Sequence, residues 1–243
     1  RIICCNTSNK TIEEVIDGIN VTKYASFGIF ASLPISFSFI LNFYKHKADV
    51  LHFHLPNPLA VMAYFIFRIK GDIIVTWHAD ITKQKFALLL YKPFLHWFLR
   101  QAKRIIVTSP NIIQSSPHLS KFKNKITVIP LGINPKKYLE VTAPNPMKKK
   151  YALFVGRFIY YKGVLELIEA LKQSNVHLVM IGDGTLKKDI IRNGHQLIES
   201  DQLTILPFQD DITLKTFFKH CEYLILPSTH RSEAFGIVQL EAM

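Results

Sequence analysis

Residues 152–171 of the chain read ALFVGRFIYYKGVLELIEAL, and this stretch determines the predicted fold. The first four residues form a short apolar run typical of a buried strand, and the residues after Gly163 repeat apolar side chains with a helical period. A second apolar run, VHLVMIG, follows at 176–182. Strand, helix and strand at this spacing predict a βαβ unit, in which the two strands are parallel.

The same alternation recurs along the chain and predicts two such units. Strand-like runs cover residues 1–5, 20–25, 49–54, 72–79, 104–109, 125–130, 151–156, 176–182, 203–207 and 223–227. Helix-like stretches cover residues 57–68, 86–102, 163–172, 185–193 and 212–220. A change of composition at 142–150, TAPNPMKKK, indicates a linker. We therefore expect an α/β protein with two Rossmann-like, doubly wound parallel-sheet domains, 1–143 and 144–243, that face a cleft.

The composition indicates a globular protein. The chain has 243 residues, of which 49% are apolar, enough for one large core or two ordinary ones. Two apolar windows, 27–44 and 51–69, approach the length of a membrane span, but prolines interrupt both, and we interpret them as core elements. No signal peptide is evident, and the chain begins with Arg1 rather than methionine, so we expect further sequence upstream.

The cysteines and the charges restrict the compartment and the partners. Cys4, Cys5 and Cys221 show no spacing typical of a metal or disulfide site, which favours a reducing, cytoplasmic location. Residues 1–150 hold 21 Lys and Arg against 7 Asp and Glu, whereas the remainder holds 9 against 11. This excess of positive charge is compatible with a nucleic acid, an anionic membrane surface or a phosphorylated substrate.

The residues that follow the predicted strands are the candidate binding residues, because ligands of doubly wound sheets bind at the carboxyl ends of strands. The loop at the end of the strand predicted at 151–156 combines free backbone N–H groups at Gly156, the guanidinium of Arg157 and the ammonium of Lys162. This combination suits a diphosphate. Gly182 and Gly184 follow the next strand, where a glycine lets the backbone approach a ligand closely.

Two glutamates follow the last predicted strand, in the run HRSEAFGIVQLEAM at 230–243. On one continuous helix Glu233 and Glu241 would lie about 12 Å apart, farther than the roughly 5 to 9.5 Å that separates the two carboxylates of a glycosidase. We expect instead that Glu233 lies in a loop and that a helix begins near Phe235 and Gly236. Such an arrangement can hold a sugar, a diphosphate and a ribose in sequence.

Several motifs occur together and in a fixed order. EAFGIVQLE at 233–241, VGRFIYYKG at 155–163 and GDG at 182–184 resemble the donor-binding half of glycosyltransferase family 4, whose members are retaining enzymes with the GT-B fold. The N-terminal domain of that family is similar to DVLHFHLPNPLA at 49–60, VTWHADI at 75–81, RIIVTSPN at 104–111 and ITVIPLGIN at 126–134. The resemblance implies transfer of a hexosyl group from a GDP- or UDP-linked sugar to a glycan or lipid-linked acceptor, in the synthesis of cell-envelope polysaccharide or glycolipid.

The resemblance also implies how the donor is held. Arg157 and Lys162 would bind its diphosphate, Glu233 would hydrogen-bond its sugar, and Glu241 would bind its ribose hydroxyls. No Asp-x-Asp motif occurs in the sequence, so neither a metal ion nor another cofactor is expected. The positive side chains would then stabilise the charge of the leaving diphosphate.

Four further residues receive a role from the same resemblance. The backbone amides of Phe235, Gly236 and Ile237 would approach the sugar and the phosphate. His78, in the first half of the chain, would face the reacting sugar on the acceptor side.

The chain is shorter than the resemblance requires. Gly18, Gly28 and Gly71 are the only glycines in the first 131 residues, and none belongs to the Gly-rich loop that follows the first strand of the family. The family also continues beyond Met243 with further strands and a closing helix. The resemblance therefore implies that the chain is an internal fragment of a longer enzyme.

Other functions remain open at this point. His52 and His54 share one face of a strand, as in the His-x-His metal site of some hydrolases, but no matching His, Lys and Asp set follows, which favours strand-packing or acceptor-facing histidines. A GT-B relative that epimerises or phosphorolyses a sugar nucleotide would have the same two domains. The basic half contains no nucleic-acid recognition module, so no nucleic-acid partner is expected.

The stretch KQKFALLLYKPFLHWFLRQAKR at 83–104 predicts a helix with a cationic face. On a helical wheel one side carries Lys85, Lys92, His96 and Lys103, and the other carries Ala87, Leu90, Phe94, Trp97 and Phe98. One interpretation is a core-facing helix with a solvated basic face, which Pro93 kinks. The other is that this face, with Arg100 and Arg104, contacts the anionic cytoplasmic leaflet of the membrane, where the protein would be peripheral.

Overall fold

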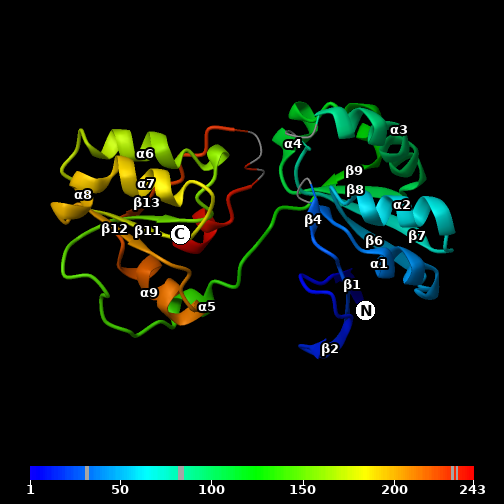
Figure 1. Cartoon of the computed structure of the whole chain (residues 1–243), viewed down its shortest axis with the longest axis horizontal. Helices are drawn as coiled ribbons and strands as arrows, with labels where there is room; N and C mark the ends of the chain where they lie inside the picture. The colour runs from blue at the N-terminus through cyan, green and yellow to red at the C-terminus, as the bar shows by residue number, and fades with distance from the viewer. Residues whose placement is uncertain (31–32, 82–84, 231–232, 234) are drawn as a thin grey trace. The chain divides into compact units, whose positions relative to one another are not determined.

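The computed structural model describes residues 1–30, 33–81, 85–230, 233 and 235–243 (Figure 1). The chain divides into two compact units, Arg1–Pro130 and Leu131–Met243. Both units contain a parallel sheet with helical connections, so the predicted α/β class is confirmed. Across the described ranges, every helix is too short or too polar to cross a membrane.

The first unit is built on a four-stranded parallel sheet whose strands follow one another in sequence order. The strands are β6 (Val50–Leu55), β7 (Asp72–Trp77), β8 (Arg104–Val107) and β9 (Ile126–Val128). Helices α2 (Pro58–Phe67) and α3 (Lys85–Gln101) connect the first three strands. Phe53 of β6 is buried because it packs against Tyr64 and Phe98 of these helices, with ring centroids 5.9 and 4.7 Å away.

The beginning of the first unit contains antiparallel pairs that the prediction lacks. β2 (Ile12–Ile16) and β3 (Ile19–Tyr24) form a hairpin through Asp17 and Gly18, which both have positive φ, as an Asp-Gly turn favours. The other strands and short helices of this unit are β1 (Ile2–Cys5), β4 (Ile29–Phe30), β5 (Leu33–Pro34), α1 (Phe37–Asn42), η1 (Phe43–Lys45), α4 (Pro110–Ser115) and η2 (Ser120–Lys125).

The helix α3 differs from its predicted amphipathic arrangement. Phe94 and Trp97 pack against α2, each with its ring centroid 5.1 Å from that of Phe65. Leu90 lies one turn earlier, before this contact begins, and is 63% exposed, so the prediction that it faces the core is wrong. Lys103 lies beyond the end of α3 and forms an ion pair of 2.5 Å with Asp72, so it is not part of a helix face.

Three further expectations for α3 have different outcomes. Phe98 is buried, as predicted. His96 is half-buried, with its Nε2 3.3 Å from Nδ1 of His118, rather than on an open cationic face. The side chains of Lys85 and Ala87 lie outside the part that the structure describes.

The second unit contains a parallel sheet of four strands in the order β12-β11-β10-β13. The strands are β10 (Ala152–Val155), β11 (Leu178–Ile181), β12 (Leu203–Leu206) and β13 (Tyr223–Leu224). The helices are α5 (Lys136–Leu139), η3 (Tyr160–Lys162), α6 (Val164–Leu171), α7 (Lys187–Asn193), α8 (His195–Glu199), α9 (Asp211–His220) and α10 (Val238–Ala242).

Helices cover both faces of this sheet. Figure 1 shows α6, α7 and α8 on one face and α5 and α9 on the other. Alternate residues of β10 contribute to two separate cores: Phe154 packs with residues of α6 and α7, and Leu153 packs with Phe217 and Phe218 of α9. The doubly wound arrangement that the sequence predicts is therefore confirmed for this unit.

Residues 131–143 pack with the second unit. Nζ of Lys219 donates a hydrogen bond to the carbonyl of Val141, and Nε2 of His220 lies 3.0 Å from the carbonyl oxygen of Ala143. Tyr138 of α5 packs against the ring of Phe218, with centroids 6.3 Å apart. The compact second unit consequently begins at Leu131, ahead of the division between 143 and 144 that the linker composition suggested.

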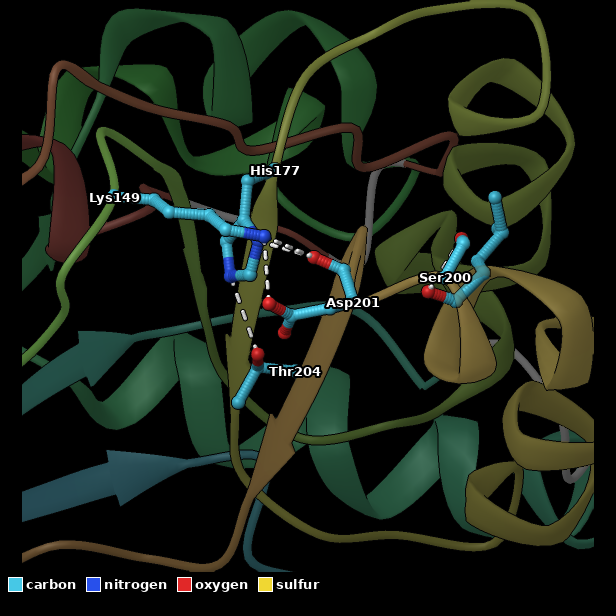
Figure 2. Close-up of polar contacts among 6 residues, drawn as sticks. Lys149, His177, Ser200, Asp201 and Thr204 are labelled. Atoms are coloured by element: carbon cyan, nitrogen blue, oxygen red, sulfur yellow. Dashed lines mark hydrogen bonds and ion pairs between the residues drawn. The ribbon is translucent and has the colours of Figure 1, made fainter.

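A buried histidine connects the amino ends of β11 and β12 (Figure 2). Nδ1 of His177 lies 2.7 Å from the carbonyl oxygen of Asp201, and Nε2 lies 3.2 Å from Oγ1 of Thr204. Because a carbonyl only accepts, Nδ1 carries a proton and donates it to the carbonyl, and Nε2 pairs with the Thr204 hydroxyl, which can both donate and accept. Lys149 adds an ion pair of 2.6 Å to the Asp201 carboxylate. Both ring nitrogens are thus satisfied, and His177 supports the turn before β12.

Candidate active site

The order of the strands in the second unit reverses beside β10. From β10 the chain proceeds through β11 to β12 on one side of the sheet, and it then returns to place β13 on the other side. The loops that leave β10 and β13 therefore separate at a topological switch point, where doubly wound proteins bind their ligands. Most of the predicted donor-site residues lie in these two loops.

The loop after β10 and the loop after β13 are in direct contact. Gly163 has φ +64, and a Cβ at this position would lie 2.0 Å from the carbonyl oxygen of Pro227. The backbone amide of Thr229 donates to the carbonyl of Tyr161 at 3.0 Å. A residue without a side chain is therefore required at Gly163, and it fixes where Lys162 projects from the preceding turn.

Lys162 and Glu233 are brought together by this contact between loops. Their side chains form an ion pair with 2.5 Å between Nζ and Oε2, and only 12% and 18% of the two side chains are exposed. The hydroxyl of Ser228 donates to the same Oε2 at 3.0 Å. As expected from the sequence, Glu233 lies in a loop before the helix. Ser228 is absent from the sequence prediction, because a lone serine after a strand gives no distinct signal.

Arg157 is exposed and lies in the loop directly after β10. Its Nη2 donates a hydrogen bond of 2.9 Å to the hydroxyl of Tyr161. A guanidinium has five donors, so this contact orients the group and leaves most of its donors for a ligand. Tyr161 thus lies at the candidate site, although the sequence motifs assign it no role.

The glycines of the β10 and β11 loops allow the loops to pack against each other. Gly156 has φ +155, and the Cβ position of Gly182 lies 2.0 Å from its carbonyl oxygen. The Cβ position of Gly184 lies 2.5 Å from the carbonyl oxygen of Phe158. Close contact between neighbouring strand ends thus accounts for Gly182 and Gly184, whereas the sequence suggested close approach to a ligand. Their predicted role in donor binding stays a prediction.

The end of the chain places the remaining predicted donor residues around α10. Gly236 has φ +72, and its Cβ position lies 2.6 Å from Cδ2 of Leu226. Phe235 is half-buried and Ile237 is 38% exposed. Glu241 lies in α10, where its Oε1 accepts a hydrogen bond of 3.0 Å from the hydroxyl of Tyr138. The roles of these residues in donor binding stay predictions.

His78 belongs to the first unit, where it forms a cluster with the two histidines of β6. Nε2 of His78 lies 2.8 Å from Nδ1 of His54, and the two rings are within 13° of parallel. Nε2 of His52 lies 2.7 Å from Oγ1 of Thr76. Burial, followed by the neighbouring His54, lowers the pKa of His78 and likewise that of His52.

The contact between His54 and His78 restricts how these two histidines can be protonated. Where two imidazole nitrogens meet at hydrogen-bond distance, one must donate and the other must accept, so His54 and His78 cannot both be protonated at the contact. Neutral imidazoles of this kind can hydrogen-bond sugar hydroxyls. No group of three or more His, Cys, Asp or Glu in the described part of the chain is arranged to hold a metal ion.

Sequence comparison identifies the family. A family profile described as Glycosyltransferase Family 4 matches residues 1–137, more than half of the chain. The chain belongs to glycosyltransferase family 4. A second profile, described as Glycosyl transferases group 1, matches residues 139–243 of this family 4 protein. The recognition made from the sequence motifs is therefore confirmed.

Two curated relatives of this family 4 protein come from bacteria. It is 33% identical over 223 residues to O-antigen chain mannosyltransferase C of Escherichia coli, which covers 87% of the chain and 58% of the relative. It is 31% identical over 209 residues to D-rhamnosyltransferase WbpZ of Pseudomonas aeruginosa, which covers 80% of the chain and 52% of the relative. The family 4 chain thus spans little more than half the length of these relatives.

Solved structures share the fold of this family 4 protein. The structure of HepE from Anabaena in complex with UDP and glucose matches 93% of the chain and 65% of its own length, with a TM-score of 0.64 and 19% sequence identity. At this identity the likeness concerns the fold alone. It confirms that the two Rossmann-like units have the GT-B fold.

Proposed function

We propose that the chain is part of a retaining, metal-independent glycosyltransferase that moves a hexosyl group from a nucleoside-diphosphate sugar to a glycan or lipid-linked acceptor of the cell envelope. The observation that carries this proposal is the position of Lys162 and Glu233, paired at the switch point of the second sheet beside the loop that holds Arg157. Two cations and one carboxylate in this place match a ligand that has both a diphosphate and sugar hydroxyls.

The proposed chemistry depends on the charge that develops on the leaving group. When the bond between the sugar and the diphosphate breaks, negative charge accumulates on the phosphate oxygens. Arg157 and Lys162 stabilise this charge, a task that a metal ion performs in other enzymes. Retention of the anomeric configuration is inferred from the family resemblance. His78 would hydrogen-bond the reacting sugar through a neutral imidazole.

We propose that Lys162 changes its partner when the donor binds. In the structure its ammonium is neutralised by Glu233, and both groups are largely shielded from water. A donor diphosphate competes with the carboxylate for Lys162, and the displaced carboxylate becomes available to accept a hydrogen bond from a sugar hydroxyl. The same exchange would bring the lysine to the phosphate and the glutamate to the sugar, which are their proposed roles.

The relatives support a donor of the hexose class. The names of the two curated relatives specify transfer of mannose and D-rhamnose, and D-rhamnose is 6-deoxymannose. HepE was solved in complex with UDP and glucose. We therefore propose a hexose or 6-deoxyhexose as the transferred group, carried by GDP or UDP, in the synthesis of a polysaccharide such as an O-antigen.

The experiment that tests this function uses the full-length natural protein with GDP-mannose, GDP-D-rhamnose, UDP-glucose and UDP-N-acetylglucosamine. We expect release of nucleoside diphosphate from one of these donors, unchanged by a chelator, and a product with the anomeric configuration of the donor, as NMR would show. Formation of a sugar phosphate in the presence of inorganic phosphate would instead indicate a phosphorylase. A new sugar nucleotide would indicate an epimerase, and loss of activity with the chelator would contradict metal independence.

A lipid-linked acceptor gives a role to the exposed part of α3. Leu89 and Leu90 are 66% and 63% exposed, and Lys92 is exposed within the same turn. Exposed leucines beside a cation, in a unit rich in Lys and Arg, are typical of a helix that contacts an anionic membrane surface. We include this peripheral contact in the proposal, with the leucines and Lys92 in place of the wholly cationic face that the sequence suggested.

A further inference from the structure

A hydrogen bond joins two residues of the second unit that are far apart in the sequence. The hydroxyl of Tyr138, in α5, donates to Oε1 of Glu241, in α10, at 3.0 Å. Glu241 is the residue that the family resemblance assigns to the ribose of the donor. Nothing in the sequence motifs assigns a role to Tyr138.

The ring of Tyr138 is held by two contacts, both from α9. It meets the ring of Phe218 edge to face, with centroids 6.3 Å apart at 69°. On α9, Nζ of Lys215 lies 5.3 Å from the centroid of the Tyr138 ring. Lys215 is itself buried and forms an ion pair with Asp211. Because these contacts fix the ring, the direction of its hydroxyl is fixed as well.

The protonation of this pair favours a lasting hydrogen bond. Burial, followed by the hydrogen bond to Glu241, raises the pKa of Tyr138 to about 12. The phenol therefore remains a donor throughout the physiological range. A carboxylate offers about four lone-pair sites over its two oxygens, and Tyr138 occupies one of them on Oε1. Oε2 and the remaining site on Oε1 are left for the two hydroxyls of a ribose.

We propose that Tyr138 is a positioning residue, which orients the Glu241 carboxylate so that it accepts hydrogen bonds from the ribose of the donor nucleotide. The inference rests on the proposed function, since it takes the assignment of Glu241 to the ribose from it. Glu241 lies in a helix of five residues, α10, which constrains the glutamate weakly on its own. The hydroxyl of Tyr138 supplies the missing constraint from α5.

The competing explanation is that the hydrogen bond only stabilises the packing of α5 against α10 and has no part in nucleotide binding. The two explanations differ in which ligands are affected when the hydroxyl is removed. A structural tie affects every ligand of the second unit equally. A positioning residue affects only those ligands that carry the ribose hydroxyls, because a nucleotide without them gains nothing from a well-oriented carboxylate.

The test measures binding of UDP and GDP to the full-length protein by calorimetry, and then of the 2′,3′-dideoxy analogue of the tighter ligand. In Tyr138→Phe we expect the affinity for the ribonucleotide to fall about fivefold, with little change for the dideoxy analogue. The matched control is Tyr151→Phe, because the hydroxyl of Tyr151 also makes a hydrogen bond in this core, 2.9 Å to the carbonyl of Phe217. This control should leave the ratio of the two affinities unchanged.

Three results would overturn the inference, and they separate it from the proposed function. An equal loss for both ligands in Tyr138→Phe would show a structural tie. The ratio of the affinities for the ribonucleotide and its dideoxy analogue could also stay unchanged in Tyr138→Phe and fall in Glu241→Ala. This result would mean that Glu241 binds the ribose and that Tyr138 does not orient it. An unchanged ratio in Glu241→Ala, or no binding of either nucleotide, would instead refute the proposed donor site and the inference with it.

Discussion

Lys162 and Glu233 neutralise each other in the second unit, with 2.5 Å between their charged atoms. The family resemblance assigns one residue to the phosphate of the donor and the other to its sugar, so each is expected to act on a different part of the ligand. In the structure the two residues pair with one another. We therefore expect substitutions of Lys162 and of Glu233 to change the affinity for the nucleoside diphosphate in opposite directions.

Glu233→Gln is expected to bind the nucleoside diphosphate more tightly and to turn over the sugar nucleotide more slowly. The substitution removes the carboxylate that competes with the phosphate for Lys162, and we expect a gain in affinity of about three- to tenfold. Calorimetry with UDP or GDP measures the first effect, and initial rates measure the second. Glu222→Gln is the control, because Glu222 pairs with Lys150 on the surface. Weaker binding of the diphosphate by Glu233→Gln would refute the proposed exchange.

Lys162→Ala is expected to weaken binding of the nucleoside diphosphate more than Arg157→Ala does, and neither should affect the nucleoside. Loss of either charged contact costs about 1.5 to 3 kcal/mol, but Lys162→Ala also leaves Glu233 as an unpaired negative charge beside the phosphate. Adding Glu233→Gln to Lys162→Ala should therefore restore part of the affinity. Binding of UDP and uridine, or GDP and guanosine, by calorimetry decides this. Equal losses for nucleotide and nucleoside would contradict the assignment of both residues.

Gly163→Ala is expected to destabilise the second unit by more than about 2 kcal/mol, because it adds a side chain at positive φ and against the backbone of Pro227. The matched control is Gly132→Ala, since a Cβ at Gly132 meets no atom within 4 Å. Thermal unfolding of the two variants, compared with the unsubstituted protein, measures the difference. Equal melting temperatures for the two variants would mean that the contact between the loops is not as close as described.

The first unit is expected to lose stability as the solution becomes acidic. Burial lowers the pKa of His52 and His78, so the folded protein resists their protonation. The unfolded chain takes up these protons below about pH 6.5. Stability is therefore fully present above that pH and is lost as the pH falls through the lower pKa values of the folded state. Denaturant unfolding at several pH values should show this slope, and it should become shallower in His52→Asn and His78→Asn.

Binding to anionic vesicles is expected to depend on α3. Replacing Leu89 and Leu90 with glutamine, or Lys92 with glutamine, should reduce co-sedimentation of the full-length protein with vesicles that contain phosphatidylglycerol, and salt should reduce it further. Lys188→Gln, an exposed lysine of the second unit, is the control. Binding that is indifferent to the anionic lipid, or unaffected by the α3 substitutions, would favour a soluble acceptor.

The repeating pattern of strand and helix predicts the second unit well because its signals are strong. The sequence from β10 to β11 combines a buried apolar strand, an amphipathic helix and a second apolar strand, and each of them packs as its periodicity predicts. The hairpin of β2 and β3 is missing from the prediction although Asp17 and Gly18 signal a turn. Ile12–Ile16 contains two adjacent glutamates and pairs on only one side, with β3, so its pattern is too weak to identify a strand.

The sequence predicts which loops hold the residues of the candidate site, but it does not predict which of their side chains contact each other. Sequence motifs indicate that Arg157, Lys162 and Glu233 follow strands that end at the same edge of the sheet. They do not indicate that Lys162 and Glu233 form an ion pair, because this depends on the close approach of two loops at Gly163. The sequence motifs do not indicate the contact between Tyr138 and Glu241 either, because the sequence assigns residues 1–143, and with them Tyr138, to the first domain.

The packing of residues 131–143 against the second unit has a consequence for recombining glycosyltransferases. A chimaera joined at the compositional boundary, after residue 143, would take α10 from one parent and α5 from the other. Such a protein would inherit Glu241 without its own Tyr138, and it would separate His220 from the carbonyl of Ala143. A junction between Pro130 and Leu131 transfers these contacts as a set. Residues 131–143, which the sequence assigns to the first domain, are therefore better exchanged together with the second unit.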